Sequence, residues 1–438
     1  MILPTSLALV SSTFTGKERG QALAVWGSTI GAAAAIGPLL GGALAEVSWR
    51  WAFGVNIPLG MLIFFGVRAF LAPSPRTSGG VDLPGAVLSV VGLGLLAFAL
   101  IEGRTYGWTT TVRPLGLAGL SWDHGPSPVL VALLVAAVAL IAFVRRQSTL
   151  SRGCGAEPLM DVRLFAIRSF RNGNIATLII GLGEFGIVAV LPLWLQFTLD
   201  YSPLQAGLAL LTLAVGSFVA SGASFGMTTS ISPLGLVRLG LALEIAGLAG
   251  LGLFAAPGRS WWSIALTLFL FGVGVGFATA QVTNVVLADV PGPSAGQGSG
   301  IQSAARQLGS ALGIAILTTA FFSVLSSALH QRLVATGTPG PQSDQLTDTV
   351  TNSAGAVIAP LAADPQTAAL ADAARAAMTD GISMAGYLAA GLLVLGLIAT
   401  ALIPSVAAAT AAEPSPRNRH DLDHHLAPVL GRRYRIVS

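Results

Sequence analysis

Residues 21–45 read QALAVWGSTIGAAAAIGPLLGGALA, a run without a charged residue. About 20 apolar residues in a helix cross a bilayer, so this run is long enough to span one. Its small residues let two helix backbones touch, which helices in lipid need because lipid gives them no hydrophobic drive to associate. A proline inside the run, Pro38, removes a backbone donor and bends the helix. The stretch therefore predicts a bent membrane helix that packs closely against a neighbour.

The whole chain has the composition of a membrane protein. Of its 438 residues, 53% are hydrophobic and 10% are charged, whereas a soluble domain has about 25% charged residues. Such a chain cannot cover itself with a water-facing surface. We therefore expect an all-α, polytopic membrane bundle with about ten full transmembrane helices, preceded by a partial one in residues 1–14. The expected spans lie near residues 21–45, 52–71, 83–103, 127–145, 172–196, 203–224, 236–256, 261–288, 302–327 and 382–404.

The positive charges agree with this layout. If the loop at Lys17 is cytoplasmic and the sides alternate, the inner segments hold 17 of the 23 Lys and Arg residues. This asymmetry follows the positive-inside rule and places the C-terminus in the cytoplasm. The net charge of +4 therefore indicates membrane orientation, and we expect no nucleic-acid partner because the basic residues are scattered between apolar runs.

Two carboxylates lie inside expected spans, Glu184 and Glu244. A charge in the bilayer centre is costly, so an ionisable group there is a functional candidate. Burial disfavours the charged form of a carboxylate, which suits a group that must take up and release a proton near neutrality. Both are predicted proton-coupling residues. The alternative for each is a neutral glutamic acid that is hydrogen-bonded between helices.

Other polar and aromatic side chains inside the spans are candidates for a substrate cavity, since aromatic faces attract cations and ligand pockets hold few polar groups. Lipid-facing or packing roles are the alternative for each of them. Arg306 lies near the inner end of its span, where snorkelling to the interface is favoured over contact with substrate or with an acidic partner. The candidates are Phe185, Trp194, Gln196, Gln281, Asn284 and Arg306.

Three motifs together resemble a known family. They are Gly37-Pro38-Leu39-Leu40-Gly41-Gly42, Trp49-Arg50-Trp51 and Asn56-Ile57-Pro58-Leu59-Gly60. This combination resembles the drug:proton antiporters of the major facilitator superfamily, in the branch with fourteen helices. The resemblance continues over nearly the whole chain, for example at Leu191–Gln196, Ser202–Gly207 and Arg306–Gly313. It implies that Gly37, Pro38, Gly41 and Gly42 form the antiporter motif, and that Trp49, Arg50, Trp51, Asn56 and Pro58 form a signature at the outer interface.

In that family the Gly-Pro-x-x-Gly-Gly element closes the fifth helix. The resemblance therefore implies that the first three helices and most of the fourth lie outside this sequence, and we expect a misplaced start codon or a truncated gene. The implied domains follow the same plan. They are a remnant of the amino-terminal bundle (1–71), two linking helices (83–145), a cytoplasmic loop (146–171), a carboxy-terminal six-helix bundle (172–404) with an extracytoplasmic segment (329–380), and a cytoplasmic tail (405–438). A short alanine-rich helix is expected at 365–378 within the extracytoplasmic segment.

The resemblance implies a multi-pass protein of the inner (plasma) membrane that exports lipophilic or cationic drugs in exchange for protons, by alternating access. We expect no cofactor and no metal, with the proton gradient as the energy source, since the chain has no P-loop. Its polar segments show no nucleophile–base or metal-ligand spacing, so an enzyme is not expected. The expected partners are lipid, protons and a small lipophilic or cationic substrate, and the expected state is a monomer. Two alternatives stay open, an exporter of an endogenous metabolite or antibiotic and a truncated, non-transporting membrane protein.

Overall fold

A computed structural model describes most of the chain. The described residues are 39–70, 82–117, 120–123, 125–153, 158–228, 230–256, 261–291 and 294–403, with isolated positions before residue 39. Pro38, the cysteine Cys154 and the tail after residue 403 lie outside them. Expectations about these positions stay predictions.

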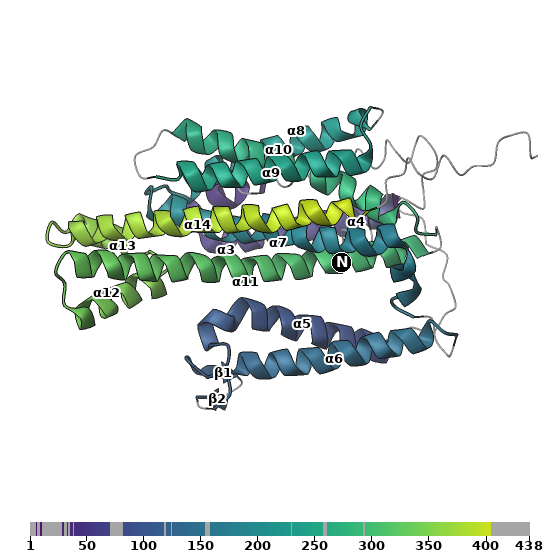
Figure 1. The fold of residues 1–438 in the computed structure, drawn as a ribbon, viewed down its shortest axis with the longest axis horizontal. Coiled ribbons are helices and arrows are strands. Elements are labelled where there is room, and N and C mark those ends of the chain that lie inside the picture. The colour runs from purple at the N-terminus through teal and green to yellow at the C-terminus, as the bar shows by residue number, and fades with distance from the viewer. Residues whose placement is uncertain are drawn as a thin grey trace, which may run out of the picture. The chain divides into compact units, whose positions relative to one another are not determined.

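The described residues are almost entirely helical (Figure 1). The elements are α3 (Trp49–Gly54), α4 (Asn56–Phe70), α5 (Leu83–Tyr106), β1 (Leu115–Leu117), β2 (Leu120–Trp122), α6 (Pro128–Leu150), η1 (Val162–Ala166), α7 (Arg168–Phe197), α8 (Pro203–Met227), α9 (Pro233–Phe254), α10 (Trp261–Leu287), α11 (Ala295–Ala335), α12 (Gly340–Asn352), α13 (Ile358–Ala363) and α14 (Ala368–Ala401). Residues 39–47 are helical as well.

Nine helical segments among the described residues are long and apolar enough to cross a membrane. They coincide with nine of the ten spans expected from the sequence, which confirms an all-α polytopic membrane bundle. The remaining expected span, 21–45, lies mostly outside the described residues. The short antiparallel hairpin β1–β2, between α5 and α6, was not expected from the sequence.

Helix starts follow ordinary capping chemistry. Pro stands in the first turn of α5, α6, α8 and α9, where its missing N–H costs no helix bond. In α8, Ser202 accepts a hydrogen bond from Gln205 N, and the Gln205 side chain accepts one from Ser202 N. This capping box satisfies two backbone donors and fixes the start of α8.

The helices from α7 onward pack in two groups (Figure 1). Helix α11 packs extensively against α7 and α14, while α10 packs against α8 and α9. Helix α14 also contacts α9 and α7, so it joins the groups. Small residues allow this closeness: a Cβ on Gly309 or Gly313 of α11 would collide with the carbonyl oxygens of Leu178 and Leu182 on α7. The glycines of 181–186 pack against α11 and α14 in the same way, as small residues do between membrane helices.

The segment 329–380 is more helical than expected. Helix α11 runs 41 residues to Ala335 and α14 runs 34 residues from Ala368, and a helix rises about 1.5 Å per residue, so both exceed one bilayer core. The short helix expected at 365–378 is the beginning of α14. Ion pairs Arg332–Asp380 and Arg375–Asp200 stabilise these extensions, and α14 buries Ala371, Ala374 and Ala377 there. An apolar run in the sequence predicts the part of such a helix that spans the bilayer, but it does not predict how far the helix extends beyond the bilayer.

The linking helices α5 and α6 pack against each other, and α5 contacts α11. The guanidinium of Arg104 on α5 lies over the ring of Phe322 on α11, 3.6 Å from its centroid. At the opposite end, the buried carboxylate of Asp82 accepts hydrogen bonds from Gly85 N, Arg146 Nε and Gln147 Nε2 at 3.0, 2.7 and 2.8 Å. Arg146 and Gln147 lie in the last turns of α6, which continues past residue 145 to Leu150. The first residues of the loop expected at 146–171 are therefore helical.

Asp82 gives a pH-dependent prediction. Burial alone would raise the pKa of its carboxyl, but the hydrogen bonds from Gly85, Arg146 and Gln147 outweigh burial and lower that pKa below its ordinary value of 3.8. A carboxyl with a lowered folded-state pKa contributes stability above its unfolded pKa, and loses it as the pH falls through the folded pKa. We expect Asp82→Asn to lower the melting temperature of the purified protein at neutral pH, with the difference from wild type shrinking on acidification. A difference that does not change with pH would contradict the ionic account.

Candidate functional site

Glu184 lies in the middle of α7 and forms a buried ion pair. Its side chain is almost fully buried, with 4% of the residue exposed. Nη2 of Arg306, on α11, donates to Oε2 of Glu184 at 2.8 Å. The two residues are 122 positions apart in the sequence. A carboxylate buried without a partner charge is strongly destabilising, so Arg306 makes an ionised Glu184 tolerable at this depth.

Thr279 on α10 completes the pair into a cluster of three helices. Its hydroxyl donates to Oε1 of Glu184 at 3.1 Å and accepts from Nη2 of Arg306 at 3.0 Å. The cluster Glu184–Thr279–Arg306 is thus the polar centre at which α7, α10 and α11 meet. Sequence analysis missed Thr279, because a threonine in an apolar helix is common and the residues around it show no pattern that indicates a functional role.

The close approach of α7 to α11 positions this cluster. A Cβ on Gly181 would lie 2.7 Å from the carbonyl oxygen of Arg306, and one on Gly186 would lie 2.6 Å from that of Gly313. Only glycine fits between these backbones. The glycines on either side of Glu184 therefore bring its carboxylate within reach of Arg306.

Arg306 differs from the favoured expectation. Its side chain is 30% exposed and turns to Glu184 rather than snorkelling to the interface, because the acidic partner lies within hydrogen-bonding distance. The ring of Phe185 lies 5.7 Å from the Arg306 guanidinium carbon, and Phe185 is 38% exposed. Phe185 and Arg306 thus combine an aromatic face with a cation beside the buried carboxylate.

Glu244 is the second buried carboxylate. It lies on α9 with no exposed surface, and neither of its carboxyl oxygens has a hydrogen-bond partner in the described part of the chain. Its Cγ packs where a Cβ on Gly274 of α10 would stand. An unpartnered acid in such a position is tolerated as the neutral form. The structure does not bring Glu244 into the hydrogen bonds of the Glu184 cluster.

The other cavity candidates divide by exposure. Trp194 has no exposed surface, and its indole Nε1 donates to Thr379 Oγ1 of α14 at 3.1 Å. Gln281 is equally buried, and it donates to Ser224 of α8 at 2.9 Å and accepts from Asn284 at 3.1 Å. Trp194 and Gln281 therefore join helices in this structure, and a role for them in a substrate cavity stays a prediction. Gln196 and Asn284 are partly exposed and stay candidates.

The glycines of the Gly-Pro-x-x-Gly-Gly motif differ from each other. Gly42 comes closest to another helix, since a Cβ there would lie 2.6 Å from the carbonyl oxygen of Pro203 at the start of α8. At Gly37 or Gly41, no atom of the described residues lies within 4 Å of such a Cβ. Gly42 therefore marks the place where this helix touches the carboxy-terminal helices.

The residues after this motif are mostly exposed. Trp49 and Trp51 are 62% and 60% exposed, and the Arg50 guanidinium lies 4.6 Å from the Trp49 ring centroid. Glu46 and Arg50 are four residues apart, a spacing that allows an ion pair on a continuous helix. The helix is interrupted at Ser48, and Glu46 instead bonds Ser202 and Leu204.

The last two signature residues lie in α4. Asn56 donates from Nδ2 to the Phe53 carbonyl at 3.1 Å, across the junction between α3 and α4. Pro58 is exposed near the start of α4. Asn56 therefore stabilises the entry into α4.

No group of three or more His, Cys, Asp or Glu side chains within the described ranges is placed to hold a metal ion. The histidines of the carboxy-terminal tail lie outside those ranges. The site is therefore built from one carboxylate, one guanidinium and one hydroxyl. Of these groups the carboxylate can bind and release a proton, and the carboxylate and the guanidinium can bind a charged ligand.

The nine long apolar helices of the described residues define an integral membrane protein. The sequence profile of the Major Facilitator Superfamily matches residues 1–314, and the chain belongs to this superfamily. Its members are transporters and not enzymes. This match confirms the family resemblance that the sequence motifs indicate.

Several curated relatives are named as an antibiotic transporter or as drug-resistance proteins. The chain is 29% identical over 343 residues to a probable actinorhodin transporter of Streptomyces coelicolor, covering 75% of this chain and 55% of the relative. It is 30% identical to the multidrug resistance protein Stp of Mycobacterium tuberculosis, with 75% and 58% covered. It is 32% identical to the puromycin resistance protein pur8 of Streptomyces alboniger, with 73% and 60% covered. The chain thus spans somewhat more than half the length of these relatives.

Proposed function

We propose that this chain exports lipophilic or cationic compounds in exchange for protons, as a secondary active transporter of the plasma membrane. The observation that carries the proposal is the buried cluster Glu184–Thr279–Arg306. Placing a carboxylate inside a membrane bundle costs free energy, so a carboxylate found there is a functional candidate. The relatives' names support export of drugs or antibiotics.

The cluster suggests how a proton and a cationic substrate would compete for the carboxylate of Glu184. When Glu184 is ionised, it is held by Arg306 and Thr279, and it also offers a negative charge to a cationic substrate. A proton on Glu184 removes that charge and weakens the attraction for the substrate. The exposed ring of Phe185 adds a face that attracts cations. Binding of the substrate therefore favours loss of the proton, and protonation favours release of the substrate.

Glu244 is a second proposed proton-binding residue. Its burial without a hydrogen-bond partner suits a group that carries a proton for most of the cycle. Because Glu184 is paired with Arg306 and Glu244 lies outside the cluster, the two carboxylates would have different roles. Glu184 would exchange its proton with the substrate, and Glu244 would supply a second site for protons.

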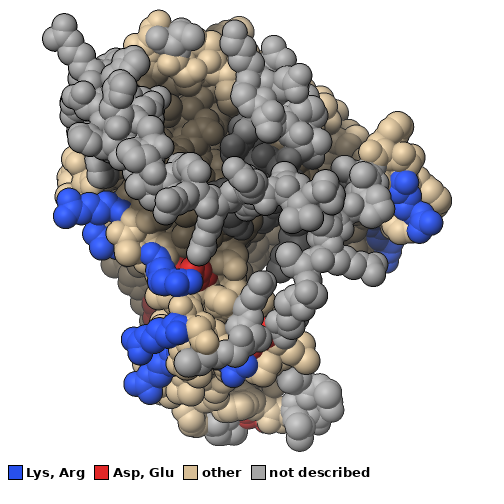
Figure 2. Space-filling model, turned by 90° about the vertical axis from the view of Figure 1, so that its right-hand side faces the viewer, with Lys and Arg blue, Asp and Glu red and all other residues tan. Residues whose placement is uncertain are grey.

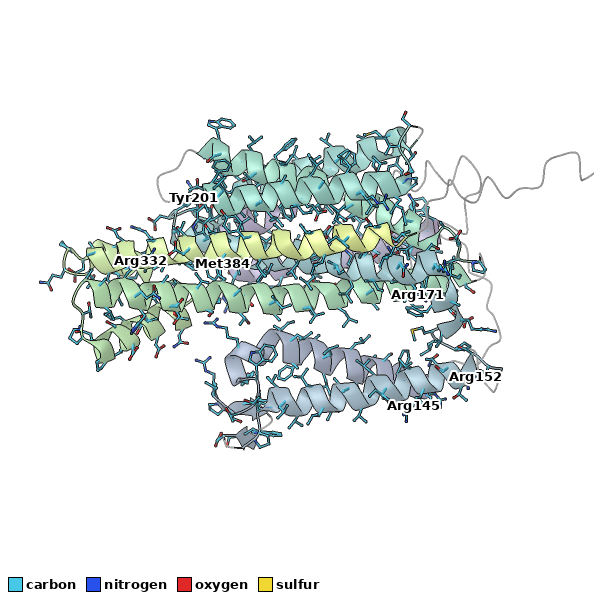
Figure 3. All side chains as sticks on the ribbon, in the orientation of Figure 1. Arg145, Arg152, Arg171, Tyr201, Arg332 and Met384 are labelled. Atoms are coloured by element: carbon cyan, nitrogen blue, oxygen red, sulfur yellow. The ribbon has the colours of Figure 1, made fainter. Side chains whose placement is uncertain are left out.

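Orientation in the membrane follows from the arginines. Arg145, Arg152 and Arg171 lie at one end of the helices, and Tyr201 and Arg332 lie at the other (Figure 3). Basic side chains gather on the face seen from the first end (Figure 2). We propose that this basic end is cytoplasmic, by the positive-inside rule, which places the C-terminus there too. The opposite end, with α12 and α13, would then be extracytoplasmic.

The substrate could instead be a product of the same cell. The names of the relatives include an actinorhodin transporter and a cephamycin export protein, which favours this second candidate. Export of an endogenous antibiotic uses the same cluster and differs only in the compound. A panel of substrates separates the two, since a drug exporter transports several unrelated cations and a dedicated exporter transports one.

Transport by this chain is tested in everted membrane vesicles with ethidium as a fluorescent cation. We expect ethidium accumulation when a proton gradient is imposed, and its loss when a protonophore collapses the gradient. Vesicles without the protein supply the baseline. Accumulation equal to that baseline would contradict export of cationic drugs and would leave the dedicated exporter and the non-transporting protein as the alternatives.

A further inference from the structure

We propose that Glu46 is a positioning residue that holds α8 to the helix ending at Val47 and so keeps that end of the bundle closed. The inference rests on the proposed function, because closing one end matters only for a protein that alternates between two open states. It concerns a residue outside the proton-binding cluster. The evidence for the inference is the set of contacts that Glu46 makes.

Glu46 binds two donors at the start of α8 with a single oxygen. Its Oε1 accepts from Ser202 Oγ at 2.7 Å and from Leu204 N at 3.3 Å. Leu204 is in the first turn of α8, where backbone N–H groups have no partner within the helix. Ser202 Oγ also accepts from Gln205 N at 3.2 Å. Glu46 thus extends the capping box of α8 with a side chain from a distant part of the sequence.

The charge of Glu46 suits this position. A helix carries a partial positive charge at its N-terminus, and a nearby carboxylate is stabilising there. Helix α8 has no acidic residue of its own in its first turn. Glu46 supplies the missing negative charge, so the contact depends on ionisation as well as on hydrogen bonding.

Gly42 makes the approach possible. It lies one helical turn before Glu46 and therefore on the same face. Its backbone comes so close to Pro203 that an added Cβ would lie 2.6 Å from the Pro203 carbonyl oxygen. The two positions make one contact, in which Gly42 allows the backbones to touch and Glu46 bonds the helix end.

This contact joins two parts of the chain that alternating access would separate. Among described residues 39–70, Glu46 makes the only hydrogen bonds that the structure shows to α7 through α14. In alternating access one group of helices rocks against the other around a central site. Opening this end therefore requires Ser202 and Leu204 to leave Glu46.

The test measures the distance across this end by spin labelling. Labels at Val47→Cys and Trp262→Cys, with Cys154→Ser, report it, because both positions are highly exposed. Trp262 is the second residue of α10, which packs against α8, and the rings of Tyr201 and Trp261 lie 6.3 Å apart. We expect Glu46→Gln to increase the long-distance population relative to the short one by about two- to fivefold, the range of a charge at a helix end. Glu102→Gln removes an acid from α5 and should leave the ratio unchanged.

A double-mutant comparison separates the contact from a general loss of stability. If Glu46 acts through α8, Ser202→Ala should add little to Glu46→Ala, because one interaction is lost only once. Unchanged distances in Glu46→Gln and Glu46→Ala, or fully additive effects, would overturn the proposal. The measurement needs no transport, so a shifted distance without ethidium flux would overturn the proposed function and leave the role of Glu46 standing.

Discussion

Replacement of Glu184 by Gln is expected to abolish proton-driven ethidium accumulation in everted vesicles. Gln keeps the size of the side chain and can accept from Thr279, but it cannot take up a proton or carry a charge. We expect at least about a tenfold loss of accumulation, equivalent to about 1.4 kcal/mol or more in a coupling free energy. Gradient-independent exchange of ethidium should survive better than gradient-driven accumulation, because Gln has nearly the size of Glu and leaves the packing around the cluster unchanged.

The control for Glu184→Gln is Glu102→Gln. Glu102 is an acid on α5, a helix outside the cluster, and its replacement should leave accumulation near the wild-type level. The amount of folded protein in the membrane must be equal for both variants. Normal gradient-driven accumulation by Glu184→Gln would show that Glu184 does not couple transport to protons, and Glu244 would then be the remaining candidate.

Replacement of Gly313 by Ala is expected to destabilise the bundle more than its size suggests. The added methyl group would collide with the carbonyl oxygen of Leu182 on α7, and two backbones cannot move apart as a side chain can. Overpacking of this kind costs about 1–3 kcal/mol. It also moves α7 away from α11 and lengthens the ion pair between Glu184 and Arg306. We expect a lower melting temperature and lower gradient-driven accumulation together.

Gly391→Ala is the matched control for this variant. Gly391 lies in α14, and no atom in the described part of the chain lies within 4 Å of an added Cβ there. Ala is the better helix former by about 0.8–1.0 kcal/mol, so this variant should be as stable as wild type or more stable. Equal stability of the Gly313 and Gly391 variants would show that α7 and α11 are not packed backbone to backbone.

The architecture was largely predictable because it follows from apolar length. A bilayer core has a fixed thickness, so a run such as 203–224 predicts a helix, and α8 occupies it. The helices α11 and α14 were predicted too short. Their extensions are stabilised by pairs such as Arg332–Asp380, which join residues far apart in the sequence and leave no local pattern.

The site was predictable only in part. The cost of burying a charge pointed to Glu184 and Glu244 without any contact being known. The partnership of Glu184 with Arg306 was not predictable from periodicity, because it depends on how α7 crosses α11. Trp194 was predicted as a cavity residue from its chemistry, and the structure places it in the interior against Thr379. Composition indicates what a side chain can bind, and only packing shows what it faces.

Proton release on substrate binding tests the coupling by Glu184 most directly. Tetraphenylphosphonium is added to the purified protein in weakly buffered detergent solution, and a pH-sensitive dye records the protons released. At a pH low enough for Glu184 to carry a proton before substrate is added, the account predicts a release from wild type and from Glu102→Gln, and none from Glu184→Gln. A release from Glu184→Gln equal to that of wild type would contradict the claim that substrate and proton compete for this carboxylate.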